Sequence, residues 1–176
     1  MKLIVVIPCF NEEKTLGSVL QSIPKRIPKI NKIETLVVDD GSTDKTLKVA
    51  RKHRVKHFVI HHQNQGLAKS FADGLDEALH LGADIIVNTD GDNQYPQEDI
   101  PRLIKPIMDG KADMVVADRQ TDKIAHFSRG KKFLQKFGSS VVRIFSGVNV
   151  PDAVSGFRAY SRDAALHLTI FTDYTY

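Results

Sequence analysis

Short apolar runs alternate along the chain with longer segments in which apolar residues recur every three or four positions. Uninterrupted apolar runs are typical of buried strands, and the wider spacing is typical of helices that lie on a sheet. The runs predict strands at residues 3–7, 33–38, 57–60, 83–89 and 114–117. The segments between them predict helices at residues 11–23, 42–53, 67–81 and 101–108.

Residues that commonly begin or end helices support these boundaries. Asn11 is expected to cap the first helix, which ends before Pro24. Ser42 or Thr43 is expected to cap the second helix, and Gly82 follows the last turn of the third. Because strands alternate with helices, we expect a single α/β domain with a mainly parallel sheet sandwiched by helices.

Polar residues follow the predicted strands at the points where the strands end. In a doubly wound sheet, ligands bind in the crevice outside the carboxyl ends of the strands. Each of these polar groups could belong to an ordinary surface turn. A single ligand site, however, accounts for all of them at once. The groups are Asp39 and Asp40, residues 64–66, Asp90 and Asp92, and Asp118 with Arg119.

The fourth predicted strand runs directly into Asp90, Gly91 and Asp92. In extended backbone, residues two apart point to the same side, so the two carboxylates and Gln94 can face one point. Gly91 allows the backbone a close approach there. Oxygen ligands suit a hard cation such as Mg²⁺ or Mn²⁺, which commonly keeps positions open for substrate phosphates. The alternative is a solvated turn, because Asp, Gly and Asn are common turn residues.

Length, charge and cysteine content narrow the class of protein. A chain of 176 residues, of which 41% are hydrophobic, can form one domain with its own core. The net charge is +4, and basic residues are dispersed except within residues 123–143, which argues against a nucleic-acid partner. Cys9 is the single cysteine, so no disulfide can form within the chain. The first apolar run is too short for a signal peptide or a membrane span, which indicates a cytoplasmic protein.

The two commonest nucleotide-binding loops, GxxxxGK[ST] and GxGxxG, are absent from the sequence. A nucleotide would need other partners, and Asp39 and Asp40 could accept hydrogen bonds from a base or a ribose. The alternative role for this pair is helix capping. Residues 123–143 predict a basic amphipathic helix or helical pair, which either packs on the sheet or recruits a membrane surface or a phosphate.

Several short segments, in order along the whole chain, resemble one family. They resemble the family 2 glycosyltransferases of the GT-A fold, and among them most closely the polyprenyl-phosphate sugar transferases of the dolichol-phosphate mannose synthase type. Each segment is modest alone, but the ordered set is specific. The segments are VIPCFNEE at 6–13, VVDDGSTD at 37–44, NQGLA at 64–68, DGDNQ at 90–94 and SGFR at 155–158.

The resemblance implies a GT-A, Rossmann-like catalytic domain over residues 1–176 and roles for particular side chains. Asp92, Arg119 and Asp152 are expected to take part in catalysis, and Arg119 and Arg129 to meet the acceptor phosphate. The residues expected to hold Mg²⁺ or Mn²⁺ are Asp90, Asp92 and Gln94. The residues expected at the nucleotide are Pro8, Phe10, Glu12, Asp39, Asp90 and Gly91.

The implied reaction is an inverting, metal-dependent transfer of a hexosyl group from a nucleotide-diphosphate sugar to a polyprenyl or dolichyl phosphate. The donor would be GDP-mannose or a UDP-hexose, and the acceptor would lie at the cytoplasmic face of a membrane. Two alternatives are open: transfer to a saccharide hydroxyl, with Asp152 as the base, and a nucleotide-sugar-binding module without catalysis. Gly91 and Asn93 stand where the family usually has alanine and leucine, which leaves the sugar open. Because the family's catalytic domain usually continues for several more elements, we expect a C-terminally truncated chain.

Overall fold

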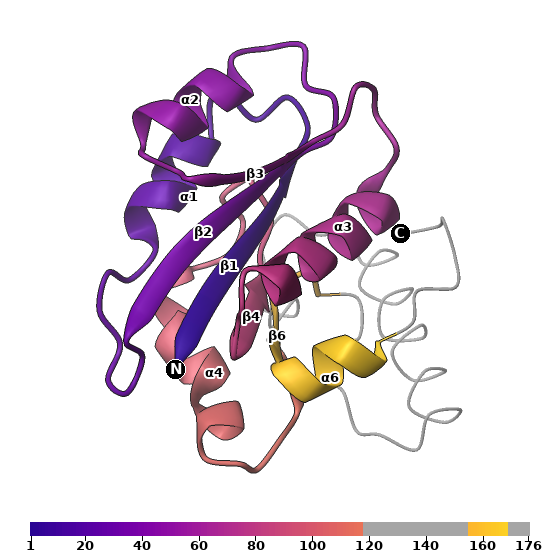
Figure 1. The fold of residues 1–176 in the computed structure, drawn as a ribbon. Coiled ribbons are helices and arrows are strands. Elements are labelled where there is room, and N and C mark those ends of the chain that lie inside the picture. Colours follow the sequence, from indigo (N-terminus) through magenta and orange to yellow (C-terminus); the bar gives the residue numbers. More distant parts are fainter. Residues whose placement is uncertain (118–154, 169–176) are drawn as a thin grey trace, which may run out of the picture.

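A computed structural model describes residues 1–117 and 155–168, which contain one six-stranded sheet (Figure 1). The strands are β1 (Lys2–Cys9), β2 (Lys32–Asp39), β3 (His57–Ile60), β4 (Ile85–Asn88), β5 (Met114–Val116) and β6 (Arg158–Ser161). They lie in the order β3-β2-β1-β4-β6-β5. The first four strands in that order pair in parallel, and β6 runs antiparallel to both β4 and β5. The predicted α/β class and mainly parallel sheet are therefore confirmed.

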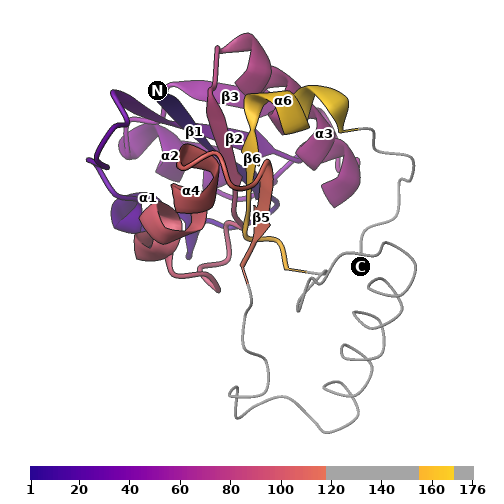
Figure 2. The same cartoon turned by 90° about the horizontal axis from the view of Figure 1, so that it is seen from below.

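Helices cover both faces of this sheet (Figures 1 and 2). They are α1 (Leu16–Ser22), α2 (Thr46–Lys52), α3 (Leu67–His80), α4 (Ile100–Met108) and α6 (Arg162–His167), with a short 3₁₀ helix η1 (Gln97–Asp99) before α4. Alternate residues of β1 face the two layers. Leu3, Val5 and Ile7 pack with α1, α2 and α4, whereas Ile4 and Val6 pack with α3 and α6. A strand buried on both faces reads as a continuous apolar run, which is why the sequence predicts β1 well.

The strand register brings the carboxyl ends of neighbouring strands to one edge, which we call the carboxyl edge. Cys9 is opposite Asp39 in the pairing of β1 with β2. The N–H of Asp40 donates to the carbonyl of Cys9 at 2.9 Å, and the N–H of Thr89 donates to the carbonyl of Val6 at 3.1 Å. The segments that follow β1, β2 and β4 therefore start side by side, as the sequence predicts.

Some predicted boundaries are wrong. The helix starts are too early, because α1 begins at Leu16 and α2 at Thr46. The pattern of the sequence also does not predict β6 and α6, since the residues around 155–158 were expected to form a loop. No helix within residues 1–117 and 155–168 is long and apolar enough to cross a membrane. The predictions for Asp118, Arg119, Arg129, Asp152 and residues 123–143 lie outside the described residues.

Candidate functional site

The loops that follow β1 and β2 are joined by hydrogen bonds in both directions. The N–H of Asn11 donates to Oγ of Ser42 at 2.9 Å, and the N–H of Thr43 donates to Oδ1 of Asn11 at 2.9 Å. Asn11 has a φ of 57°, in the left-handed region that Asn visits more readily than most residues. These bonds occupy the side chains that were expected to cap helices, which is why α1 and α2 begin later. The two loops form one platform at the carboxyl edge.

The side chains of Thr46, Asp44 and Glu13 complete this platform by accepting hydrogen bonds from backbone N–H groups. The N–H of Glu12 donates to Oγ1 of Thr46 at 2.8 Å, and the N–H of Glu13 donates to Oδ2 of Asp44 at 3.0 Å. The carboxylate of Glu13 accepts in turn from the N–H of Lys45 at 3.0 Å. Burial would raise the pKa of Asp44, but its hydrogen bonds with Thr46 and Glu13 outweigh burial and lower it. Asp44 and Glu13 are therefore engaged in holding the platform together.

Asp40 is engaged in holding the loop between β3 and α3. Its carboxylate accepts from the N–H groups of Gln65 at 2.8 Å and Gly66 at 2.9 Å, and lies 2.7 Å from Nδ1 of His61. The other ring nitrogen of His61 lies 3.0 Å from the carboxylate of Asp73 on α3. Burial would raise the pKa of Asp40, but the bonds from His61 and the two backbone groups lower it overall. Asp40 thus fixes the start of α3, which leaves its neighbour Asp39 as the acid available to a ligand.

Asp39 is the last residue of β2 and is 1% exposed. Its Oδ1 atom is buried and has no hydrogen-bond partner within residues 1–117 and 155–168. Leaving a buried carboxylate oxygen without a donor is unfavourable, so such an atom indicates a position where a ligand can supply one. Pro8 lies at the end of the adjacent strand β1, and Phe10, which is 46% exposed, follows it. Three residues expected at the nucleotide therefore lie together.

The acidic turn after β4 lies directly against the end of β1. The extended backbone expected here is wrong, because β4 ends at Asn88, residues 91 and 92 form a turn, and Asn93 has a φ of 63°. Gly91 is buried, and a Cβ atom on it would lie 2.9 Å from Sγ of Cys9 and 3.4 Å from the carbonyl oxygen of Pro8. A larger residue at this position would require either the turn or the side chain of Cys9 to shift.

The residues expected to hold a metal ion all belong to this turn and its flanks. Asp90 and Asp92 are partly buried, and Gln94 is exposed. The N–H of Gln94 donates to Oδ1 of Asp92 at 3.0 Å, so these two residues are linked within the turn. Asp90 lies on the other side of the turn, where its carboxylate meets Gly156. A shared direction for the three side chains therefore cannot be argued from strand alternation.

The electrostatic environment at the end of β1 is strongly negative. Burial raises the pKa of the Cys9 thiol, and the carboxylates of Glu12, Asp39 and Asp90 raise it further. Cys9 therefore stays a neutral thiol, and the acids around it come from the loops after β1, β2 and β4. Carboxylates gathered in this way favour the binding of a cation or of hydrogen-bond donors.

These side chains fit a divalent cation that takes part of its coordination from a ligand. Within the part of the chain that the structure describes, no group of three His, Cys, Asp or Glu side chains is placed to hold a metal ion by itself. Magnesium and manganese bound by one or two carboxylates commonly complete their shell with substrate phosphates and water. The negative charge around Cys9 and the orphaned oxygen of Asp39 suit such a shared site.

The loop before β6 contributes a contact that the sequence did not predict. The N–H of Gly156 donates to the hydroxyl of Tyr95 at 2.8 Å, and Nδ2 of Asn88 donates to the carbonyl of Gly156 at 3.0 Å. In the sequence, only the segment SGFR drew attention to this loop, and it does not predict a contact with Tyr95 or Asn88. Loop and turn are more than 60 residues apart in sequence, with separations of 61 and 68 for these two bonds.

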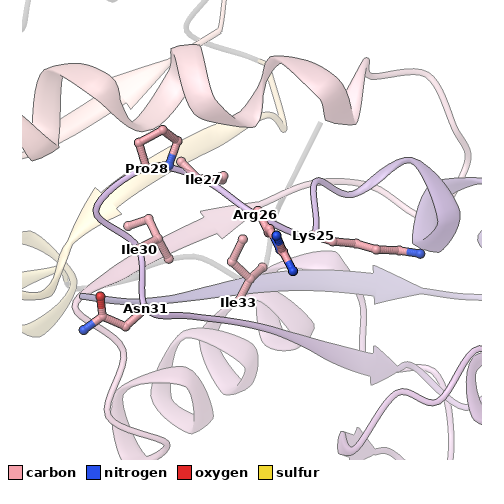
Figure 3. Close-up of a pocket in the computed structure, with 7 residues that line it drawn as sticks. All are labelled: Lys25, Arg26, Ile27, Pro28, Ile30, Asn31 and Ile33. Atoms are coloured by element: carbon pink, nitrogen blue, oxygen red, sulfur yellow. The ribbon is translucent and has the colours of Figure 1, made fainter.

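A separate depression of about 560 Å³ lies at the opposite edge of the sheet, beside the start of β2. Figure 3 shows the residues that line it, among them Lys25, Arg26 and Ile33. None of its lining residues belongs to the platform or to the acidic turn. The depression therefore carries no weight in assigning the role of the carboxyl edge.

Fold and site together define a glycosyltransferase domain of the GT-A type. The chain belongs to glycosyl transferase family 2, whose family model matches residues 4–169. It is 31% identical over 178 residues to a UDP-N-acetylglucosamine–dolichyl-phosphate N-acetylglucosaminyltransferase of Methanococcus voltae, covering 91% of this chain and 69% of the relative. It is 30% identical over 169 residues to an undecaprenyl-phosphate mannosyltransferase of Micrococcus luteus, covering 93% and 68%.

A solved structure is similar over most of the described fold. It is glucosyl-3-phosphoglycerate synthase from Mycobacterium tuberculosis in complex with Mn²⁺, UDP and glucosyl-3-phosphoglycerate, with 26% sequence identity and a TM-score of 0.69. The match covers 92% of this chain and 57% of that chain. The chain thus spans little more than half of the solved neighbour and about two thirds of the two curated relatives.

Proposed function

We propose that the chain is the donor-binding domain of an inverting, metal-dependent enzyme that transfers a hexosyl group from a nucleotide-diphosphate sugar to a polyprenyl phosphate. The observation that carries the proposal is the orphaned Oδ1 of Asp39, buried beside the acidic turn. The names of the relatives, which act on dolichyl phosphate and undecaprenyl phosphate, support a lipid-linked acceptor. The neighbour bound to UDP and Mn²⁺ supports a nucleotide donor and a divalent cation.

Residues of the platform are proposed to bind the nucleoside. Asp39 would accept hydrogen bonds from the base or the ribose, and the exposed ring of Phe10 would pack on the nucleoside beside Pro8. Glu12 would reach the nucleoside from the loop after β1. The tight approach of Gly91 to β1 would set the diphosphate close to these groups. GDP-mannose and UDP-hexoses are both candidates, because a base edge can also be read by backbone groups.

Asp90, Asp92 and Gln94 are proposed to hold Mg²⁺ or Mn²⁺. When bound, the cation would supply neutralisation of the charge that develops on the departing nucleotide diphosphate. The carboxylates would orient the donor so that its anomeric carbon faces the acceptor in line with the leaving group. We further propose that Arg119 meets the donor diphosphate and, with Arg129, the acceptor phosphate.

The acceptor decides whether a general base is needed. A phosphate monoester is largely ionised near neutral pH, because its second pKa is about 6, so a lipid phosphate can attack without a base. A saccharide hydroxyl would need one, and Asp152 is the proposed base in that case. Asp152→Asn should therefore impair transfer to a hydroxyl severely and transfer to a phosphate much less. Binding at the cytoplasmic face of a membrane belongs to the same proposal.

Calorimetric titration of the full chain with GDP and with UDP, with and without MnCl₂, tests the proposal directly. Transfer to polyprenyl phosphate from the matching nucleotide sugars follows as the activity assay. We expect Mn²⁺-dependent binding of one nucleotide, and we expect Asp92→Ala to abolish metal-dependent transfer. Asp76→Ala is the matched control, because it removes an exposed carboxylate from α3, away from the site.

Three outcomes would count against this function. Failure to bind either nucleotide would remove the donor site, and normal metal-dependent turnover by Asp92→Ala would remove the metal assignment. Nucleotide binding without transfer to any acceptor would favour the alternative of a nucleotide-sugar-binding module.

A further inference from the structure

The backbone of Gly156 is held from both sides by residues that flank Asp90. Its N–H donates to the hydroxyl of Tyr95 at 2.8 Å, and its carbonyl accepts from Nδ2 of Asn88 at 3.0 Å. Tyr95 is 7% exposed and Asn88 is 6% exposed, so both hydrogen bonds are made by buried side chains. The segment that carries Asp90 therefore binds the loop before β6 at two points, one on each side of the carboxylate in sequence.

Gly156 lies directly against the carboxylate of Asp90. A Cβ atom on Gly156 would lie 2.8 Å and 3.0 Å from the two carboxylate oxygens and 3.2 Å from Cγ. Real Cβ atoms do not approach oxygen this closely, so the backbone of Gly156 forms a wall on one side of the carboxylate. Any movement of this loop changes the space in which Asp90 can rotate.

Tyr95 is itself fixed in place, so its hydroxyl is presented in one direction. Its ring stacks on Phe157, with ring centroids 5.4 Å apart and an interplanar angle of 26°. Its carbonyl accepts from Nε2 of Gln97 at 3.1 Å, and the same Nε2 donates to Oγ1 of Thr89 at 3.0 Å. Gln97 is fully buried. Packing of the ring would be complete without the hydroxyl, so the hydrogen bond to Gly156 is a separate function of this side chain.

We propose that Tyr95 is a positioning residue for Asp90, acting through the backbone of Gly156. Its hydroxyl holds the loop before β6 against the carboxylate, which keeps Asp90 turned toward the proposed metal and diphosphate. Asn88 holds the same peptide from the carbonyl side. This inference rests on the proposed role of Asp90 in binding a divalent cation. It extends that role by naming the residues that orient the carboxylate.

Tyr95→Phe removes the hydroxyl and keeps the ring, so it tests the inference with little change in packing. Binding of Mn²⁺ is measured by electron paramagnetic resonance on the full chain with UDP or GDP at saturation, whichever nucleotide the wild type binds. We expect the half-saturating Mn²⁺ concentration to rise about tenfold, the effect typical of losing a residue that orients a metal ligand. Nucleotide affinity at saturating Mn²⁺ should match that of the wild type.

Tyr160→Phe is the matched control. Tyr160 is a buried tyrosine of β6 that packs on the opposite face of the sheet with α3 and α6, so removing its hydroxyl changes the core on that face. Gly156→Ala is a second variant, and it should weaken Mn²⁺ binding more than Tyr95→Phe because it pushes on the carboxylate directly. Gly17→Ala in α1 controls for an added methyl group, since the nearest atom there belongs to the side chain of His53.

The outcomes separate the inference from the function on which it rests. If the wild type does not bind Mn²⁺ with either nucleotide, the proposed function fails and the role of Tyr95 fails with it. If the wild type binds Mn²⁺ and Tyr95→Phe binds it equally well, the inference alone is overturned. An equal loss in Tyr160→Phe would also overturn it, because the effect would then be a general loss of stability. If Gly156→Ala does not fold, Tyr95→Phe still decides.

Discussion

The two edges of the sheet both hold a buried or nearly buried carboxylate, but they treat it in opposite ways. At the amino edge, where the parallel strands begin, the carboxylate of Glu34 lies 2.8 Å from Nζ of Lys2, 2.9 Å from Nζ of Lys32 and 3.3 Å from Nε2 of His57. At the carboxyl edge, Asp39 is 1% exposed, and its Oδ1 has no hydrogen-bond partner in the described part of the chain. Within the described residues, Glu34 therefore has two lysine ion pairs, whereas no ion pair of Asp39 is found there.

The pKa of Glu34 shows that its partners outweigh the cost of burying its carboxylate. Burial would raise the pKa of Glu34, but its bonds with Lys2, Lys32 and His57 outweigh burial and lower it to about 2. At the other edge, burial and the surrounding carboxylates all raise the pKa of Cys9. A carboxylate that is already paired stabilises the fold and has little left to offer a ligand. One that is buried without a partner weakens the fold and keeps its capacity for binding.

The largest effect is expected from Asp39→Asn. An ionised acceptor makes hydrogen bonds worth more than those of a neutral amide, so nucleotide affinity should fall by roughly tenfold to a hundredfold. The free energy of unfolding should stay the same or increase, because the variant no longer buries an unpaired charge. Calorimetric titration with the nucleotide that the wild type binds and urea unfolding measure the two quantities. A variant that loses stability and keeps its affinity would reverse the comparison between the edges.

Glu34→Gln, at the amino edge, is expected to lower stability and leave nucleotide affinity unchanged. Removing the charge leaves Lys2 and Lys32 without their anion, so the free energy of unfolding should fall by roughly 1 to 2 kcal/mol at pH 7. Nucleotide affinity should not change, because Glu34 lies at the far edge of the sheet. Glu98→Gln, at an exposed position of η1, is the control for loss of a glutamate charge. An equal loss of stability in both variants would show that the ion pairs of Glu34 contribute nothing specific.

The sequence alone predicted most of the sheet, because each of the strands β1 to β5 contains a short apolar run. It did not predict β6. That strand is four residues of mixed polarity, Arg158–Ser161, and it forms only because β4 and β5 pair with it on either side. The early helix starts have a similar cause. The side chains of Asn11 and Ser42 have ordinary capping chemistry, but a neighbouring loop about thirty residues away uses them instead, at separations of 31 and 32.

For the candidate site, the apolar runs predict where the strands end, but contacts between residues distant in sequence set the details, and the sequence does not record them. Strand ends placed Asp39, Asp90 and Asp92 at one edge. The sequence could not separate Asp39 from Asp40, since the difference depends on which of them meets His61 and the N–H groups of Gln65 and Gly66. Nor could it link Tyr95 to Gly156, because no local pattern records a contact between a turn and a distant loop.

A smaller effect is expected when the wild type is taken to low pH. The pKa of Glu34 is lowered from 4.5 to about 2 in the folded state, so the unfolded state binds more protons between these values. Its contribution is therefore complete above pH 4.5 and is lost as the pH falls toward 2. At pH 3 we expect the wild type to have lost roughly 1 kcal/mol through this group, after allowance for screening by water. Urea unfolding at pH 7 and pH 3 measures it, and Glu34→Gln should show a shallower loss over that range.

The smallest effect is expected from Asp109→Asn, an exposed counterpart of Glu34. The hydrogen bond from Lys105 lowers the pKa of Asp109, as the partners of Glu34 do for that residue, and the two charged groups lie 2.7 Å apart. Asp109 is at the surface, however, where water and salt screen an ion pair between neighbouring turns of a helix. We therefore expect no measurable change in the urea midpoint at low salt or at high salt. If the urea midpoint changes as much in Asp109→Asn as in Glu34→Gln, an ion pair stabilises the fold whether or not it is buried. If the urea midpoint does not change, the ion pairs of Glu34 matter because that carboxylate is largely buried.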